Sequence, residues 1–574
     1  MRSIHGRKRW ACWATMVGAA AAAMLQLLTI PAFAGYELPP GERVTNLPAI
    51  PRNMPQKEGY EAYDPVIGRN FDIKNLWLRA DLRVRPEMRN NTCFGGAIFG
   101  NGACNTFGGA NARGAVANSP GANIGTAAAP QNTVGNKGND FFVQQWIRLG
   151  IGYDLSPDVN FYMEIIDAAT WGGNGNPVNA GNGGDPLNHN CSSVTTGSCR
   201  LGVRAAYVLI RNLAGIQGLS MKAGRQYLVL GNQSLFGHFD WANTGYSHDG
   251  VLFAYQTKTF DSYLGWFRNS ETDLPQAAAV GSGAPNIAGT GGRDANRDAD
   301  MILFYNQYKA LPGFVLEPYY VYYKNNLGSS AVAALSNQPY LGAPKHSNQT
   351  RHMVGLRAEM RKGNWDFSTE TAWQFGQMGQ AGACVGDQKC LHINAWATRN
   401  WVGYTAYEWK WKPRLAFNFD YASGDGRNNL CGPGAVTTSC TTSNTFENFF
   451  PTNHIHMGYM DVMAWKNMLS PSVNFQARPT VRDHIEVWYT NMNVASSKDC
   501  WYRGAQGCYV FSNSNNDKNH IGDEIDFAWT RMFADGKVAF QTAYGVLLPG
   551  GYLTANLNQT VAQHWAYVSL WMNF

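Results

Sequence analysis

Much of the chain alternates between apolar and polar positions. From Leu76 to Met88 the even-numbered positions are mostly apolar, while the odd-numbered positions carry Trp77, Arg79, Asp81, Arg83, Arg85 and Glu87. A period of two residues predicts a β-strand with one apolar and one polar face. In a soluble sheet the charged face would meet bulk water. In a membrane barrel it would line a water-filled lumen while the apolar face meets lipid.

The same alternation recurs and predicts eighteen strands. We place them at 75–89, 141–155, 158–171, 202–212, 219–230, 248–258, 260–270, 299–309, 313–325, 350–361, 364–377, 392–410, 414–423, 466–478, 483–495, 520–531, 537–548 and 561–574. Short turns containing Pro, Gly, Asn or Asp alternate with long connections rich in Gly and Asn. Outer-membrane barrels combine short periplasmic turns, long outer loops and an even strand number. We therefore expect an all-β fold, a closed antiparallel transmembrane β-barrel over residues 71–574.

Composition favours a membrane protein over a soluble one. Charged residues make up 15% of the 574 residues, against about 25% in a typical soluble domain. Aromatic residues reach 13%. After residue 34, however, no apolar run approaches the ~20 residues that a spanning helix needs. A barrel satisfies every backbone polar group in lipid by closing its sheet, so the composition supports the strand pattern.

The first 34 residues have the pattern of a signal peptide. Four basic residues precede an apolar run, and the small-x-small site Ala32-Phe33-Ala34 follows. We expect cleavage near Ala34, with an uncleaved membrane anchor as the alternative, and then a proline-rich periplasmic segment over residues 35–70. Cleavage leaves 42 basic against 40 acidic residues, about +2. This balance removes the basis for nucleic-acid binding.

The ten cysteines after residue 34 form five close couples. Partners are at most 11 residues apart, whereas different couples are at least 41 apart, which favours pairing within each couple. The predicted disulfides are Cys93–Cys104, Cys191–Cys199, Cys384–Cys390, Cys431–Cys440 and Cys500–Cys508. All five fall in connections that follow an odd-numbered strand, hence on the outer side. We expect each to stiffen a loop by roughly 2–3 kcal/mol and none to bind metal.

The C-terminal residues point to assembly in the outer membrane of a Gram-negative-type cell. An alternating segment ends in Phe574 and resembles the signal that outer-membrane proteins present to the barrel-assembly machinery. A soluble edge strand that happens to end in Phe is the alternative. The expected surroundings are outer-membrane lipid and lipopolysaccharide.

Three blocks of sequence resemble the alginate-export porin family. They run from Gly224-Arg225-Gln226 to His248-Asp249-Gly250-Val251, from Tyr421-Ala422-Ser423-Gly424-Asp425 to Asn467, and from Gly522-Asp523-Glu524-Ile525-Asp526 to Pro549-Gly550-Gly551. The resemblance covers most of residues 70–574. It implies an outer-membrane barrel of about eighteen strands, whose lumen in the alginate exporters is positively charged to pass a polyuronate. The cysteine-containing loops depart from what we expect of an alginate exporter.

Charged positions on the polar strand faces are the candidate pore-lining residues. A guanidinium is always charged and offers a planar fork to carboxylates, so arginines along a pore would favour uronates. The alternative is that acids and bases simply pair across a solvated wall. Arg225 shares the parity of apolar neighbours and would face lipid, unless Gly224 marks a bulge that turns it inward or Arg225 sits at the membrane interface. The set is Arg79, Asp81, Arg83, Arg85, Glu87, Arg148, Arg225, Arg357, Glu359 and Arg361.

We expect a porin that passes hydrophilic, anionic saccharides or small polar solutes by diffusion, without cofactor or catalysis. A non-selective uptake porin is the alternative within this class. From other classes, the barrel could surround a partner protein or be a hydrolase. A hydrolase could draw on His238, Asp240, His248 and Asp249 with Ser234 or Ser247, but no Gly-x-Ser-x-Gly elbow is present. His454 and His456 with Asp461 resemble metal ligands but lack a third firm ligand.

Overall fold

The alternating segments form β-strands that join into a ring. In a computed structural model of the protein, the described residues are 75–90, 139–172, 201–241, 245–270, 299–325, 349–378, 391–425, 442–502, 504, 508–511, 518–557 and 560–573. All of them belong to one unit, Val44–Phe574. The signal peptide, the 35–70 segment and Phe574 lie outside the described residues, so the expectations for them stay predictions.

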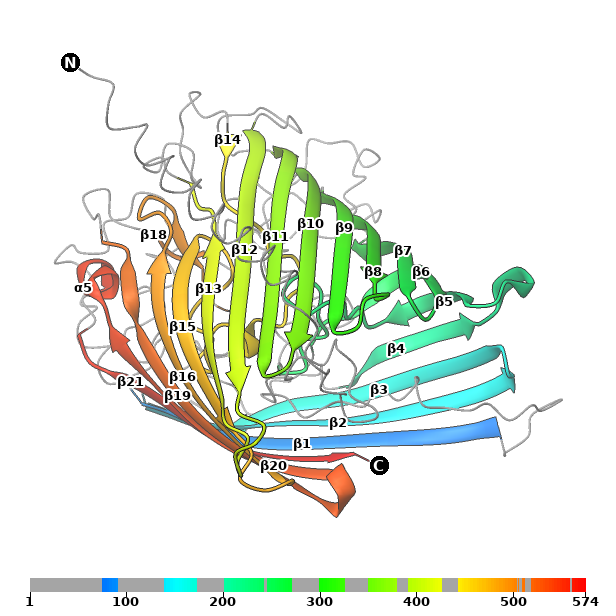
Figure 1. Ribbon diagram of the computed structural model, residues 1–574, viewed down its shortest axis with the longest axis horizontal. Coiled ribbons are helices and arrows are strands. Elements are labelled where there is room, and N and C mark those ends of the chain that lie inside the picture. Colours follow the sequence, from blue (N-terminus) through cyan, green and yellow to red (C-terminus); the bar gives the residue numbers. More distant parts are fainter. Residues whose placement is uncertain are drawn as a thin grey trace, which may run out of the picture. The chain divides into compact units, whose positions relative to one another are not determined.

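The strands follow one another along the chain with few interruptions (Figure 1). Their bounds are β1 Leu76–Asn90, β2 Asn139–Ser156, β3 Val159–Gly172, β4 Leu201–Ile210, β5 Leu219–Gln226, β6 His248–Gln256, β7 Phe260–Ser270, β8 Ala299–Tyr308, β9 Phe314–Asn325, β10 Gln349–Lys362, β11 Trp365–Met378, β12 Leu391–Thr405, β13 Arg414–Ala422, β14 Thr442–Ser443, β15 Met468–Ala477, β16 Asp483–Val494, β17 Cys500–Tyr502, β18 Cys508–Phe511, β19 His520–Phe533, β20 Val538–Pro549 and β21 Gln563–Asn573.

Hydrogen-bond pairing closes the sheet on itself. Of the described strands, nineteen form one sheet, and eighteen remain when the two-residue β14, which pairs in parallel with β12, is set aside. Each of the eighteen pairs antiparallel with its neighbours. β1 pairs with both β2 and β21, so that Asp81 lies opposite Asn573 and Asn90 opposite His564. In Figure 1 the blue β1 accordingly lies beside the red end of the chain. The expected closed antiparallel barrel is confirmed.

Two predicted strands extended too far. The alternation predicted a strand to residue 410, but β12 ends at Thr405 because the next residues form hydrogen-bonded turns, with Lys412 N donating to the Trp409 carbonyl over 2.9 Å. Likewise β5 ends at Gln226 rather than residue 230. Short β17 and β18 pair with each other in a separate sheet. The first four cysteine couples and the side chains of Cys500 and Cys508 lie outside the described part of the chain.

The two faces of the wall differ in chemistry. Outward positions carry large apolar side chains that stay exposed, including Leu264, Phe304, Trp373 and Phe417. Many inward positions carry charged, polar or small side chains, and others carry large buried ones such as Leu303 and Trp488. This is the arrangement expected when lipid surrounds the ring and a polar lumen lies within it.

Helices are few and short in the described residues. α5 covers Gly551–Leu557, and single 3-10 turns occupy η3 Leu213–Gly215, η6 Asn453–Ile455 and η7 Ala534–Gly536. None of the described helices combines the length and the apolar character that crossing a membrane requires.

Candidate functional site

Two chain segments enter the ring and cross its interior. We call them the 227–247 segment, between β5 and β6 and described at residues 227–241 and 245–247, and the 444–467 segment, between β14 and β15. Together they contact inward-facing side chains of β1, β2, β4, β11, β12, β16, β19 and β21, so they lie within the lumen. Those wall residues are Arg83, Arg85, Arg148, Arg204, Gln374, Arg399, Glu486, Glu524, Asp526, Trp565 and Tyr567.

The two inserted segments are hydrogen-bonded to each other. Gly237 N donates to the Phe450 carbonyl over 2.8 Å, and Phe450 N donates to the Leu235 carbonyl over 3.0 Å. Thr452 N reaches the Gln233 carbonyl over 3.0 Å. These hydrogen bonds satisfy backbone N–H and C=O groups that would otherwise need water inside the lumen. Because they join the two segments, the segments form one obstructing unit.

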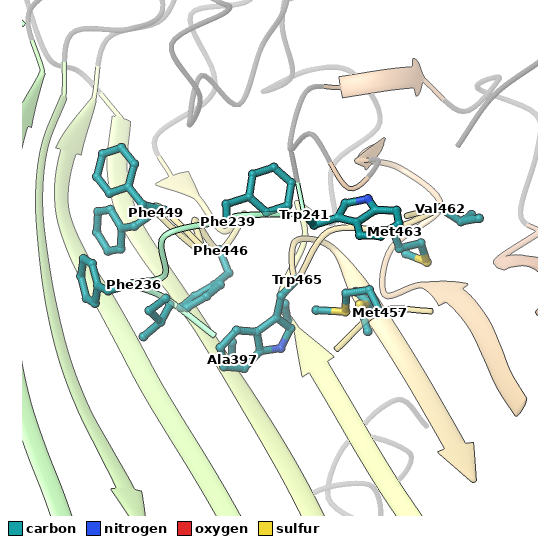
Figure 2. Packing of buried hydrophobic residues seen from close by; sticks show 14 of the residues in the cluster. Phe236, Phe239, Trp241, Ala397, Phe446, Phe449, Met457, Val462, Met463 and Trp465 are labelled. Atoms are coloured by element: carbon teal, nitrogen blue, oxygen red, sulfur yellow. The ribbon is translucent and has the colours of Figure 1, made fainter. Parts of the chain in front are cut away.

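An apolar core forms where the segments meet the wall (Figure 2). Phe236 stacks on Phe449 at 5.9 Å between ring centroids, and Phe446 contacts Trp465 at 5.4 Å. The wall beside this core carries small, fully buried side chains, which leave room for the aromatic rings: Ala372, Ala395, Ala397 and Ala422. Small wall residues and large segment residues are thus complementary, and the core excludes water from this part of the lumen.

Four arginines of the wall fasten the tip of the 227–247 segment. Arg148 Nη1 and Arg204 Nη2 donate to the two carboxylate oxygens of Asp240, over 2.9 and 3.0 Å. Arg83 Nη1 donates to the Asp240 carbonyl over 2.5 Å, and Arg85 Nη1 to the Trp241 carbonyl over 2.9 Å. All four guanidinium groups are buried. The positively charged wall formed by β1, β2 and β4 therefore holds the 227–247 segment.

The charge of Asp240 is strongly stabilised by these contacts. Burial alone would raise the pKa of its carboxyl group, but the charges of Arg148, His238 and Arg204 outweigh burial and hold the pKa below its ordinary value. These contacts therefore favour the carboxylate form of Asp240.

Trp241 is enclosed in a stack of cationic and aromatic groups. The guanidinium carbon of Arg85 lies 3.5 Å from the centroid of the indole ring, and the ring of His454 is stacked at 3.6 Å and 4°. Trp565 of β21 meets Trp241 edge-on at 5.7 Å. Glu87 accepts hydrogen bonds from Arg85 and from Trp565. Trp241 thus links both inserted segments to the junction of β1 and β21.

Carboxylates of β16 and β19 fasten the 444–467 segment. Tyr459 N donates to Asp526 over 3.1 Å and Met460 N donates to Glu524 over 2.9 Å. The Tyr459 hydroxyl donates to Glu486 over 2.9 Å. Gly458, at φ 90°, lets the backbone turn closely against Glu524. The lumen wall is therefore acidic at β16 and β19 and basic at β1, β2 and β4.

A buried ion pair gives a further attachment. Lys466 Nζ donates to both carboxylate oxygens of Glu447, over 2.9 and 2.8 Å. Burial raises the pKa of Glu447 and lowers the pKa of Lys466, and the charge of each partner offsets part of this effect. Gln374 of β11 accepts from the Glu447 backbone N–H over 2.9 Å. The pair thus stays close to the wall.

The other predicted pore residues also lie on inward faces. Arg79 pairs with Asp81 over 2.9 Å, and Arg148 also reaches Asp81 over 3.3 Å. On β10, Arg357 pairs with Glu317 of β9 and with Glu359. Arg361 is partly buried opposite Asp366 of β11. Bases and acids are interleaved here, so no long row of unmatched charge runs along the wall.

Arg225 is placed on the other face of its strand. The register continues unbroken through Gly224, so that Gln226 faces inward and Arg225 outward. Arg225 Nη1 lies 2.9 Å from Asp249, whose side chain is 50% exposed. The family-like block therefore contributes Asp240, which we did not single out as a pore residue, rather than Arg225, to the lumen. The mixture of Asp, Trp and aromatic residues in that block was its only advance signal.

Residues considered for catalysis or metal binding have other contacts. Ser247 Oγ accepts from Arg204 over 2.8 Å, and His248 and Asp249 lie on opposite faces of β6. His454 Nδ1 lies 3.0 Å from Asp461, while His456 Nε2 lies 2.8 Å from the Asn232 carbonyl. In the described residues, no group of three or more His, Cys, Asp or Glu side chains is arranged to hold a metal ion.

A closed ring with an apolar outer face and a charged, partly filled lumen defines a β-barrel channel of the outer-membrane type. Residues 122–567 match the family model described as alginate export, and the chain belongs to that family. It is therefore an outer-membrane porin-type channel.

Solved structures with a similar fold come from Pseudomonas aeruginosa. The outer membrane protein OprD has 9% identity over 88% of this chain and 96% of its own, with a TM-score of 0.47. OccD3 (OpdP) has 10% identity over 88% of this chain and 93% of its own, with a TM-score of 0.46. OccK5 (OpdH) has 9% identity over 87% of this chain and 98% of its own, with a TM-score of 0.44. No curated protein matches the chain significantly.

Proposed function

We propose that the protein lets hydrophilic, anionic saccharides of the uronate type diffuse through the outer membrane. The observation that supports this most directly is the concentration of inward arginines on β1, β2 and β4. They are Arg79, Arg83, Arg85, Arg89, Arg148 and Arg204, beside the fewer carboxylates Asp81, Glu87, Asp154 and Glu164.

The arginine groups would attract carboxylates, and the interleaved acids would keep binding weak. Guanidinium forks form paired hydrogen bonds with carboxylates, so they lower the barrier for an anion that leaves water. Conduction also requires that the solute leave each site. Pairs such as Arg79–Asp81 reduce the free positive charge and therefore favour release.

A non-selective porin for small polar solutes is the second candidate. The carboxylates Glu486, Glu524 and Asp526 on β16 and β19 favour it, because they would oppose anion entry. These carboxylates accept backbone or hydroxyl hydrogen bonds from the 444–467 segment, which engages their charge. We therefore rank the anion pathway first.

Ion selectivity in planar bilayers tests the proposal. Under a KCl gradient, the reversal potential of the wild-type channel should indicate a preference for chloride. Arg79→Gln should reduce that preference, because Arg79 lies on the lumen wall but holds neither inserted segment. Arg225→Gln is the matched control on the outward face and should leave the reversal potential unchanged. A wild type without anion preference, or equal shifts in both variants, would contradict the proposal.

A further inference from the structure

Asp240 is bound by the wall in the way an anionic solute would be. Its two carboxylate oxygens accept from Arg148 and Arg204, and its carbonyl accepts from Arg83. The carboxylate belongs to an inserted segment and not to the wall, so it can leave the arginines without breaking the strand ladder. His238 Nε2, 3.6 Å away, adds a further polar neighbour.

We propose that Arg83, Arg148 and Arg204 form a carboxylate-binding site that Asp240 fills as an internal ligand, and that a uronate saccharide opens the lumen by replacing Asp240. The inference rests on the proposed passage of anionic saccharides and adds the step that admits them. The obstructing unit is then a low-conductance state maintained by the channel's own carboxylate.

Exchange of one carboxylate for another explains why the solute must be an anion. Withdrawal of Asp240 alone would take from Arg148 and Arg204 the carboxylate to which both donate, and the loss of a charged partner from a buried ion pair is strongly unfavourable. A solute carboxylate restores the lost charge pairing, whereas a neutral sugar offers only hydroxyl groups. A uronate chain also supplies hydroxyl and ring oxygens in place of the carbonyls of Asp240 and Trp241. Anionic and neutral saccharides should therefore differ as openers.

The remaining contacts of the 227–247 segment limit how far it moves. Ser234 accepts from Arg399 of β12 over 2.7 Å, and the backbone bonds to the 444–467 segment lie between Gln233 and Gly237. These anchors lie before the tip in sequence and do not use Asp240. Phe239 N also donates to Thr452 Oγ1 over 3.1 Å, and the His238 carbonyl accepts from Tyr246 N over 2.8 Å. Replacement of Asp240 would therefore loosen Asp240 and Trp241 first, beside β1, β2 and β4.

A conductance experiment with two sugars separates an internal ligand from a purely structural ion cluster. Wild type, Asp240→Asn and Asp249→Asn are reconstituted in planar bilayers and exposed to sodium glucuronate or, at matched ionic strength, to glucose. Wild type should show a several-fold, saturable rise in conductance with glucuronate and none with glucose. Asp240→Asn should conduct without glucuronate and respond little to it. Asp249→Asn, changed at an ion-paired carboxylate on the outward face, should behave as wild type.

Several outcomes would overturn the inference. An Asp240→Asn channel with the same conductance as wild type would make Asp240 merely structural. A more conductive variant combined with a wild type that ignores glucuronate would lead to the same conclusion. Heat-dependent mobility on a gel shows whether each variant has formed its barrel, and Arg148→Gln, which weakens the same site from the wall, provides a second test. Anion preference without a glucuronate response would refute this inference alone, whereas a glucuronate response without anion preference would refute the proposed function alone.

Discussion

At the residue scale, the buried arginines bind chain as well as facing the lumen. Arg83 and Arg85 donate to carbonyl groups, and Arg148 and Arg204 to a carboxylate. A hydrogen bond to a charged group contributes about 1.5–3 kcal/mol net, whereas the loss of one partner from a buried ion pair costs roughly 3–5 kcal/mol. Because the cost of removing one partner exceeds the gain from a single hydrogen bond, these arginine contacts are hard to break unless another acceptor replaces the one that leaves.

The pKa of Asp240 predicts that mild acid leaves the conductance of the channel unchanged. Because this pKa lies below its unfolded value of about 3.9, the stabilisation is complete above that value and is lost only as the pH falls through the folded pKa. Bilayer conductance of the wild type should thus be the same at about pH 7 and about pH 5. A rise in conductance over that interval would mean that a different group controls the obstruction.

Local alternation indicates which face of a strand a residue takes, but it could not identify the partners of the candidate pore residues. It anticipated near neighbours such as Arg79 with Asp81, and Arg85 with Glu87, which do pair. The Asp240 carbonyl that Arg83 binds lies 157 positions away in the sequence. A contact of this kind depends on ring closure and on the path of an inserted segment, and neither leaves a period in the sequence.

At the element scale, the strands were predictable and the inserted segments were not. Residues 424–465 were expected to form a long outer connection, yet the described residues from 444 onward pack inside the ring. Their content of Phe, Met, Tyr and Trp is high for a solvated loop, because such side chains gain free energy when removed from water. That content was the signal available in the sequence. Gly and Asn at its start concealed it.

Gly458 should be essential for the position of the 444–467 segment. A side chain there would adopt an unfavourable positive φ and also collide with Glu524, which accepts from Met460 N. We expect Gly458→Ala to detach this turn and to increase protease cleavage within the segment. Gly363→Ala, at φ 58° with open space around it, carries the backbone penalty of about 1 kcal/mol alone. Equal cleavage of both variants would show that the Glu524 contact is unimportant.

The loop cysteines should form five local disulfides. Peptide mapping without reduction should recover each couple as one cross-linked fragment, as the short spacing within couples predicts. Reduction should leave the barrel folded, because the described strands close through backbone hydrogen bonds. A cross-link between two couples, or loss of the heat-dependent gel mobility on reduction, would contradict this prediction.

At the scale of the whole molecule, the lumen is electrically asymmetric. Arginines dominate the inward face of β1, β2 and β4, and carboxylates that of β16 and β19. The inserted segments match this asymmetry, since Asp240 is fastened to the basic side and backbone N–H groups to the acidic side. The architecture was predictable because eighteen alternating segments admit few closed arrangements. The asymmetry required knowledge of which strands become neighbours.

Trp241 contacts Arg85 of the first strand and Trp565 of the last. Its binding site is split between the two ends of the barrel sequence and does not exist until those ends meet. During biogenesis, the wall must therefore be sealed before the tip of the 227–247 segment can take its final place. In a half-assembled barrel the inserted segment would not yet obstruct the lumen. Closure of the barrel and obstruction of its lumen are therefore completed in the same step.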